Sequence, residues 1–134
     1  MFEQDYLMRM ILQLVEGIRR SMELSKQKND PSAAAEMLEA TIGQATDIDG
    51  TVLLSLAPES IADILQVSGT DPGVVEFVSR SMLLESQYLL EAGDASMAQL
   101  RAAQARALAD SYGFELGEPN EGEQEMNGFL ESLD

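Results

Sequence analysis

The chain has 134 residues and a mass of 14.6 kDa, enough for one domain with a single hydrophobic core. Its 24 acidic and 8 basic residues give a formal net charge of −16, which repels phosphate backbones and anionic lipid, so neither nucleic acid nor a membrane is an expected partner. The sequence contains no Cys, His or Trp, which excludes disulfides, thiolate and imidazole metal ligands, Cys nucleophiles and His general bases.

The first 30 residues predict one long helix. Residues 3–25 contain no Pro and a single Gly, and their apolar residues recur at spacings of three and four on one helical face. These residues are Leu7, Ile11, Leu14, Ile18 and Met22. The most apolar stretch, residues 7–15, is interrupted by polar residues and falls short of the roughly 20 apolar residues that span a bilayer, so we expect a core helix. A secretory signal begins with a basic segment, whereas two acids lie among the first five residues of this chain, so we expect a cytoplasmic protein.

A second helix is expected over residues 32–46. Asp30 can accept hydrogen bonds at the N-cap, and Pro31 suits the first turn because its missing N–H has no partner there. The expected inner face contains Ala34, Met37, Leu38, Thr41, Ile42 and Ala45. We expect Gly43 to permit close packing of this helix against the first.

Turn and cap residues predict two short and two long helices further along, over residues 51–56, 58–67, 72–92 and 95–112. Asp71 and Pro72 repeat the earlier capping pair, Asp94 caps the last of these helices and Gly113 ends it. Small residues follow one face of that helix at Ala98, Ala102, Ala105 and Ala109. No alternating apolar run predicts a strand. The expected class is therefore all-α, with two long antiparallel helical hairpins joined by short helices.

From residue 114 the composition changes. Residues 114–134 are rich in acids, Gly and Pro and contain no Lys or Arg. Within them Met126, Phe129, Leu130 and Leu133 have helical spacing. We expect a single helical domain over residues 1–113, followed by an acidic tail over 114–134 that carries a short apolar helical motif.

The turn at residues 47–51 matches a catalytic motif. Asp47 and Asp49 occupy the positions of the D-x-D-G-T motif of haloacid-dehalogenase-type phosphatases, in which the first Asp attacks phosphorus beside Mg²⁺ and the second acts as acid or base. That motif follows a buried strand, whereas here a helix end is expected, and no Lys follows it in the chain. We therefore expect a capped interhelical turn, with no catalytic residue, cofactor or metal, and keep a Mg²⁺-dependent phosphohydrolase as the alternative.

The same turn also matches part of a calcium-binding loop. Asp47, Asp49 and Gly50 fall at three positions of an EF-hand loop, but its first and twelfth ligands would be Ala45 and Leu56, which cannot bind calcium. No calcium site is therefore expected.

The last two long helices resemble a tetratricopeptide repeat, with an ordinary helical hairpin as the alternative. The matching positions are Leu89, Gly93, Asp94, Ala98, Ala102 and Ala105. More widely, the segments DYLMRMI, LLSLAPE and EAGD, at residues 5–11, 53–59 and 91–94, resemble an uncharacterised family of small cytoplasmic bacterial proteins, a domain of unknown function described as tetratricopeptide-like. The resemblance spans residues 1–113 and implies a fold rather than a chemistry.

These features favour a non-catalytic adaptor or scaffold that acts through protein contacts, with a partner that the sequence does not name. The apolar surface of the first helix is wider than one packing partner covers, which predicts a homodimer built on that helix. The candidate interaction surface is Tyr6, Met8, Met10, Leu12 and Val15, together with Met126, Phe129 and Leu130 of the tail. Two alternatives remain: the short helices or the tail cover the first helix, or the acidic chain mimics nucleic acid for a basic partner.

Overall fold

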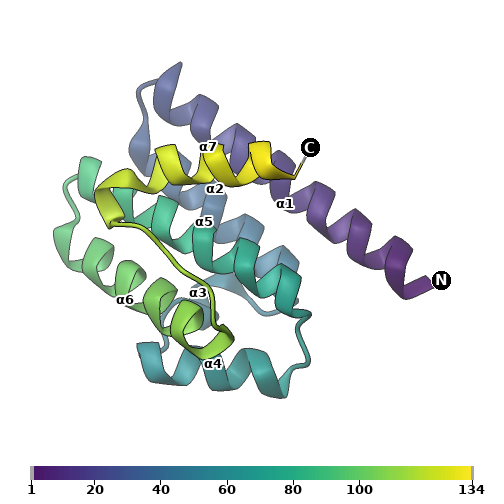
Figure 1. The fold of residues 1–134 in the computed structure, drawn as a ribbon. Helices are drawn as coiled ribbons and strands as arrows, with labels where there is room; N and C mark the ends of the chain where they lie inside the picture. Colours follow the sequence, from purple (N-terminus) through teal and green to yellow (C-terminus); the bar gives the residue numbers. More distant parts are fainter. Residues whose placement is uncertain (1, 134) are drawn as a thin grey trace.

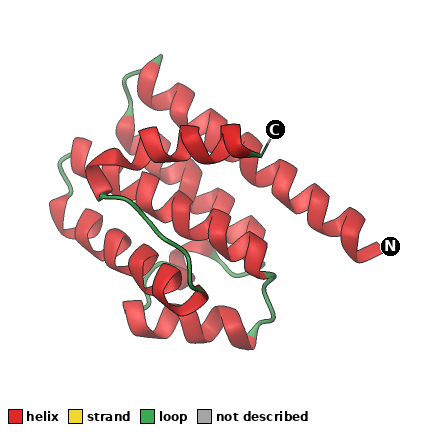
Figure 2. Cartoon of the chain, viewed as in Figure 1, coloured by secondary structure: helices red, strands yellow, loops and turns green. Residues whose placement is uncertain are grey.

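The computed structural model describes residues 2–133, in which every regular element is a helix (Figures 1 and 2). In chain order the elements are α1 (Phe2–Lys26), α2 (Pro31–Thr46), α3 (Gly50–Leu53), α4 (Pro58–Val67), α5 (Pro72–Glu91), α6 (Ala95–Tyr112), the 3-10 helix η1 (Pro119–Glu121) and α7 (Gly122–Ser132). The all-α prediction is confirmed, and the expected helix bounds differ by a few residues at most. No helix in this part of the chain has both the length and the apolar character needed to cross a membrane.

Aspartate side chains cap the helices where the sequence predicts caps. Asp30 Oδ1 accepts a hydrogen bond of 3.0 Å from the backbone N–H of Ala33, and Asp71 and Asp94 make equivalent bonds at the starts of α5 and α6. Each bond satisfies one of the N–H groups that a first helical turn leaves without a partner. Gly113, with φ of 77°, ends α6 in the left-handed conformation that costs glycine little.

The core is built around α5. This helix packs against α6, α2 and α7, and twelve of its twenty residues are buried. In Figure 1 it lies at the centre of the molecule, with the other long helices around it. The apolar side chains of all the long helices form one continuous core.

Two glycines allow close approach of backbones. A Cβ at Gly17 of α1 would collide with the side chain of Thr41, so the close crossing of α1 and α2 is at this pair. A Cβ at Gly43 would lie 2.8 Å from the backbone N of Gly50 and 3.2 Å from the carbonyl oxygen of Ile48. The expectation that Gly43 packs against the first helix is therefore wrong, because its neighbour is the turn that leads into α3.

The acidic tail packs on the helical domain. Met126 and Leu130 of α7 are buried in the same core cluster as α5, and the Phe129 ring meets Phe77 edge-on, with ring centroids 5.0 Å apart. The tail therefore contributes side chains to the core of the helical domain. It covers α5 rather than the first half of α1.

The small-residue face of α6 lies against α5, its most extensive packing partner. Ala98, Ala105 and Ala109 are buried, and Ala102 is half-buried. The hydroxyl of Ser79 on α5 donates a 2.9 Å hydrogen bond to the carbonyl oxygen of Ala105, which shows how closely the two backbones approach. A larger side chain at Ala105 therefore has no room.

We expect Ala105→Leu to lower the free energy of unfolding by about 1–3 kcal/mol, because the added atoms would force α5 and α6 apart. Ala103→Leu is the matched control, since Ala103 lies on the same helix but is exposed. Urea denaturation measures both variants. Equal stability of the two would contradict the tight α5–α6 contact.

Candidate interaction site

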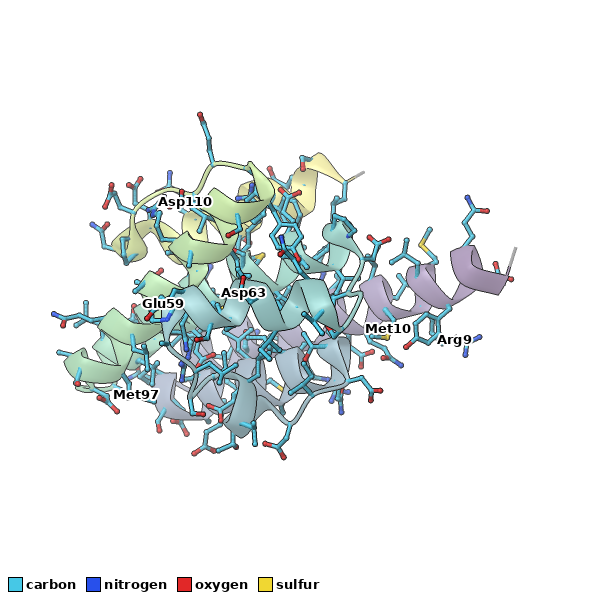
Figure 3. The ribbon with its side chains drawn as sticks, turned by 90° about the horizontal axis from the view of Figure 1, so that it is seen from below. Arg9, Met10, Glu59, Asp63, Met97 and Asp110 are labelled. Carbon is cyan, nitrogen blue, oxygen red and sulfur yellow. The ribbon has the colours of Figure 1, made fainter. Side chains whose placement is uncertain are left out.

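The N-terminal half of α1 extends beyond the rest of the molecule (Figure 1). Along the apolar face of α1, Leu14, Ile18 and Met22 are buried, whereas Leu7 and Ile11 are only half-buried. The helix packs chiefly against α2, which is nine residues shorter. Figure 3 shows the same projection from below, where the labelled residues Arg9 and Met10 lie near one end of the molecule.

This protruding half carries a concentration of exposed apolar side chains. Tyr6, Met8 and Leu12 are 60%, 58% and 61% exposed, and they lie within seven residues, whereas the other large exposed apolar residues are scattered over α3 to α7. Met10 and Val15 are half-buried and pack against the edge of the core. All five residues that the sequence predicts for this helix therefore remain at least partly accessible to a partner.

A groove of about 960 Å³ runs along one side of this half of α1. Tyr6, Leu7 and Met10 form one wall, and the opposite wall comes from the C-terminal end of α2 and the segment that joins α4 to α5. Val74 of α5 also lines the groove. The groove and the exposed residues of α1 together form the surface that we call the α1 site.

The three tail residues predicted for the interaction surface are elsewhere. Met126 and Leu130 are buried, and Phe129 is half-buried against Phe77 and Arg80. The apolar face of α7 is therefore used within the chain, and these three residues lie apart from the α1 site. The candidate interaction site is thus limited to residues 4–15 and the groove beside them.

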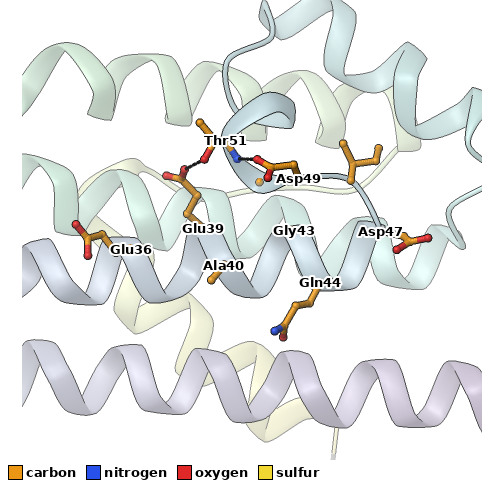
Figure 4. Close-up of a pocket in the computed structure, with 10 residues that line it drawn as sticks. Glu36, Glu39, Ala40, Gly43, Gln44, Asp47, Asp49 and Thr51 are labelled. Carbon is orange, nitrogen blue, oxygen red and sulfur yellow. Dashed lines mark hydrogen bonds between the residues drawn. The ribbon is translucent and has the colours of Figure 1, made fainter.

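The turn with the D-x-D-G-T motif lines a second hollow, of about 690 Å³ (Figure 4). Asp49 is the N-cap of α3, and its Oδ1 accepts hydrogen bonds from the backbone N–H groups of Thr51 (2.9 Å) and Val52 (3.3 Å). Asp47 follows α2 in the left-handed conformation, with φ of 57°, and its side chain lies apart from that of Asp49. The turn follows a helix, not the strand that the phosphatase motif requires.

The chemistry of this hollow does not favour a phosphate substrate. Glu36, Glu39, Asp47 and Asp49 line it together with small and neutral residues, and no lining residue is a cation, so the surface repels a phosphate monoester. Within residues 2–133 no group of three or more acidic side chains is arranged to hold a metal ion. The structure assigns Asp49 a capping role.

Behind this hollow is a buried polar cluster that the sequence analysis missed. Arg101 of α6 is 1% exposed, and its Nε donates a 2.9 Å hydrogen bond to Oε2 of Glu85, which is also 1% exposed. Arg101 and Gln104 both donate hydrogen bonds to the carbonyl oxygen of Leu54, at 2.9 and 3.0 Å. Gln104 also donates to the carbonyl oxygen of Leu56 (2.7 Å). The cluster therefore fixes the connection between α3 and α4 to the centre of the molecule.

Burial raises the pKa of the Glu85 carboxyl from 4.5 to about 7, since loss of water outweighs the attraction of Arg101. One carboxyl oxygen, Oε1, has no hydrogen-bond partner, which leaves the charged form incompletely stabilised. Arg101 has a second carboxylate nearby, because its Nη2 lies 4.0 Å from Oε2 of Glu39.

A sequence signal for this cluster does exist. Arg101 and Gln104 fall on the same face of α6 as the buried alanines, and Glu85 directly follows the apolar run Met82–Leu84 on α5. A charged residue at an apolar helical position often has a buried partner. Spacing alone does not reveal which residue that partner is.

Comparison of the chain with models of known protein families, with curated proteins and with solved structures finds no match. The assignment of function therefore depends on the geometry of the described residues.

We expect Asp49→Ala to lower the free energy of unfolding by about 0.5–2 kcal/mol, because α3 loses the side chain that accepts from its first N–H groups. Asp47→Asn is the matched control, since Asn tolerates the left-handed conformation of Asp47. Urea denaturation compares the two variants. A loss confined to Asp47→Asn would contradict the capping role of Asp49.

The raised pKa of Glu85 predicts that stability falls as the pH rises from 5 to 8. Between pH 4.5 and about 7 the folded chain retains a proton on Glu85 that the unfolded chain has released. The stabilisation is complete below pH 4.5 and is lost as the pH passes through about 7.

The Gln side chain of Glu85→Gln does not titrate. The decrease in the free energy of unfolding between pH 5 and pH 8 should therefore be smaller in this variant than in wild type, by an amount on the order of 1–3 kcal/mol. Glu59→Gln, at an exposed residue of α4, is the control and should keep the wild-type slope. Identical pH dependence in wild type and Glu85→Gln would show that Glu85 is ionised throughout this range.

Proposed function

We propose that this protein is a non-catalytic adaptor or scaffold that acts through protein contacts, and that its α1 site binds a second copy of the chain. The observation that carries the proposal is the exposure of Tyr6, Met8 and Leu12 on a helix that extends beyond its own bundle. Apolar residues concentrated in this way on one protruding element mark a surface for protein contacts.

A second copy of the chain suits this surface because it offers an identical apolar patch, and each patch can bury the other. Under two-fold symmetry the same patch faces its own copy, so the apolar residues of one α1 pack on those of the other. An antiparallel pair of helices would also bring the protruding half of each chain over the groove of its partner.

We further propose that α5 and α6 pack as a tetratricopeptide-like hairpin. The burial of Ala98 and Ala105 against α5 supports this proposal, as does the glycine turn at Gly93, where φ is 91°. The packing of α2 on α5 brings the two long hairpins side by side, as in a repeat stack. Repeat stacks present surfaces for protein partners, which agrees with an adaptor function.

We expect wild type to sediment at twice the chain mass and Leu12→Glu to sediment as a monomer, because a carboxylate would be buried at the centre of the dimer contact. Leu90→Glu is the matched control, since Leu90 is 55% exposed but lies at the far end of α5. Analytical ultracentrifugation over a range of concentrations measures all three chains.

Three results would contradict the proposed function. A wild-type chain that remains monomeric at every concentration, or equal loss of the dimer in Leu12→Glu and Leu90→Glu, would remove the α1 site as the contact. Release of phosphate from a generic aryl phosphate by wild type with Mg²⁺, lost in Asp47→Asn, would favour the phosphohydrolase alternative.

A further inference from the structure

A second surface of this molecule is occupied by its own C-terminal helix. The α7 site is the face of α5 that α7 covers, formed by Phe77, Arg80, Leu84, Gln87 and Tyr88, together with Lys26 and Arg106 at its edges. In Figure 1 α7 lies beside α5, and the segment that leads to it runs back along α5 and α6. This site differs from the α1 site in position and in charge.

The contact of α7 with this site resembles that of a peptide helix in a groove. Met126, Phe129 and Leu130 are spaced i, i+3 and i+4 and face the site, with Phe129 against the edge of Phe77. The first turn of α7 is very close to α5, since a Cβ at Gly122 would lie 3.0 Å from the carbonyl oxygen of Leu83. Three apolar anchors at this spacing are typical of amphipathic helices that bind grooves.

Basic residues at the site pair with the acids of α7. Arg80 Nη1 lies 2.9 Å from Oε1 of Glu125, and its guanidinium carbon is 4.6 Å from the centroid of the Phe129 ring. Lys26 Nζ lies 3.0 Å from Oε1 of Glu123, whose Oε2 accepts a 3.1 Å hydrogen bond from the Tyr88 hydroxyl. Arg80 also pairs with Glu76 of α5, since its Nη2 lies 2.9 Å from Oε2 of that residue, so the apolar site has an edge of basic residues with one acid of α5 among them, in a chain of net charge −16.

A third basic residue holds the segment before α7. Arg106 donates hydrogen bonds of 3.1 and 3.0 Å to the carbonyl oxygens of Leu116 and Gly117. Three of the eight basic residues of the chain thus gather at this one site. Such a concentration favours an acidic ligand over a neutral or basic one.

The helix α7 depends on this site for its structure. It has eleven residues, its N-cap residue Glu121 makes no side-chain capping hydrogen bond, and Gly128 lies in its interior, while Gln87 of the site accepts a 2.7 Å hydrogen bond from the backbone N–H of Glu123 in its first turn. A helix this short with an internal glycine is unstable by itself in water. Residues 114–118, which connect it to α6, form no regular helix. Because α7 contributes Met126 and Leu130 to the core, its release would expose the apolar side chains of α5 beneath it, which a partner helix with the same spacing of apolar residues would cover again.

We propose that the α7 site is a helix-binding site for a separate partner protein, and that α7 occupies it as an intramolecular competitor. The ligand that fits is an acidic amphipathic helix with apolar residues at i, i+3 and i+4 and Glu residues preceding them. Its binding displaces α7 and exposes the acidic tail. This binding is independent of the α1 site.

The test uses a fluorescently labelled peptide of residues 118–133 as the acidic helix, titrated with the full chain and followed by fluorescence anisotropy. Wild type should bind the peptide weakly, because its own α7 competes at an effective concentration of about 1 mM or more. Two variants weaken the intramolecular α7 and leave the site intact: Phe129→Ala, and Glu123→Gln with Glu125→Gln. Both should bind the peptide at least about 10-fold more tightly than wild type.

Controls separate the site from nonspecific association. Adding Arg80→Gln to the Glu123→Gln, Glu125→Gln chain should weaken binding at least about 10-fold, whereas adding Arg9→Gln, at an exposed residue of α1, should leave it unchanged. A peptide with Met126, Phe129 and Leu130 replaced by Ala should not bind. Thermal melts by circular dichroism establish that each chain is folded.

Absence of peptide binding by both weakened variants at about 1 mM, or equal affinity of wild type and the variants, would overturn the proposal. Leu12→Glu should bind the peptide as wild type does, which distinguishes failure of this proposal from failure of the α1 dimer. Dimers of Leu12→Glu that disappear with Phe129→Ala would identify α7 of a second copy as the ligand, and would overturn the assignment to a separate partner.

Discussion

The arrangement of this molecule depends on the burial of α5. Twelve of the twenty residues of this helix are buried, and they lie on several sides of its axis, so no single neighbour is able to shield it from water. Its most extensive contacts are with α6, α2 and α7. The need for a third cover explains why an acidic segment, which lacks the composition of a core element, folds onto the domain. Since α1 has a main partner only in α2, its first half is left without cover.

Polar groups in the interior serve a different purpose. Arg101 and Gln104 bind the carbonyl oxygens that the turn after α3 leaves without helical partners, and Glu85 balances part of the charge of Arg101. Replacing one member would leave the others buried without a partner, which costs more than the intact cluster contributes. The cluster therefore holds the connection between α3 and α4 in one position. Nearby, Asp49 caps α3, so the turn that resembles a phosphatase motif is explained by local hydrogen bonding.

Two surfaces with different chemistry follow from this packing. The α1 site is apolar and exposed on a protruding helix, and it suits a second copy that offers the same residues. The α7 site joins an apolar floor to basic edges, and within the chain it is filled by an acidic helix. The overall negative charge favours neither nucleic acid nor anionic lipid at either surface. A dimer formed through α1 would leave both α7 sites free to act, so the two proposals describe a scaffold with separate contacts for itself and for a partner.

The sequence by itself determined the helices. Periodic apolar residues, aspartate caps at Asp30, Asp71 and Asp94 and the glycine at Gly113 are local signals, because each acts within one or two turns of chain, and they placed the helix ends within a few residues. The sequence also predicted that the apolar surface of α1 is wider than one packing partner covers. Only the tertiary structure decided that α7 covers α5, that Gly43 meets the turn at Gly50, and that Glu85 and Arg101 pair inside the core. These contacts join residues far apart in the chain. Several helix faces have similar hydrophobicity, so the sequence pattern does not show which faces pack together, and only the packing of the whole molecule decides it.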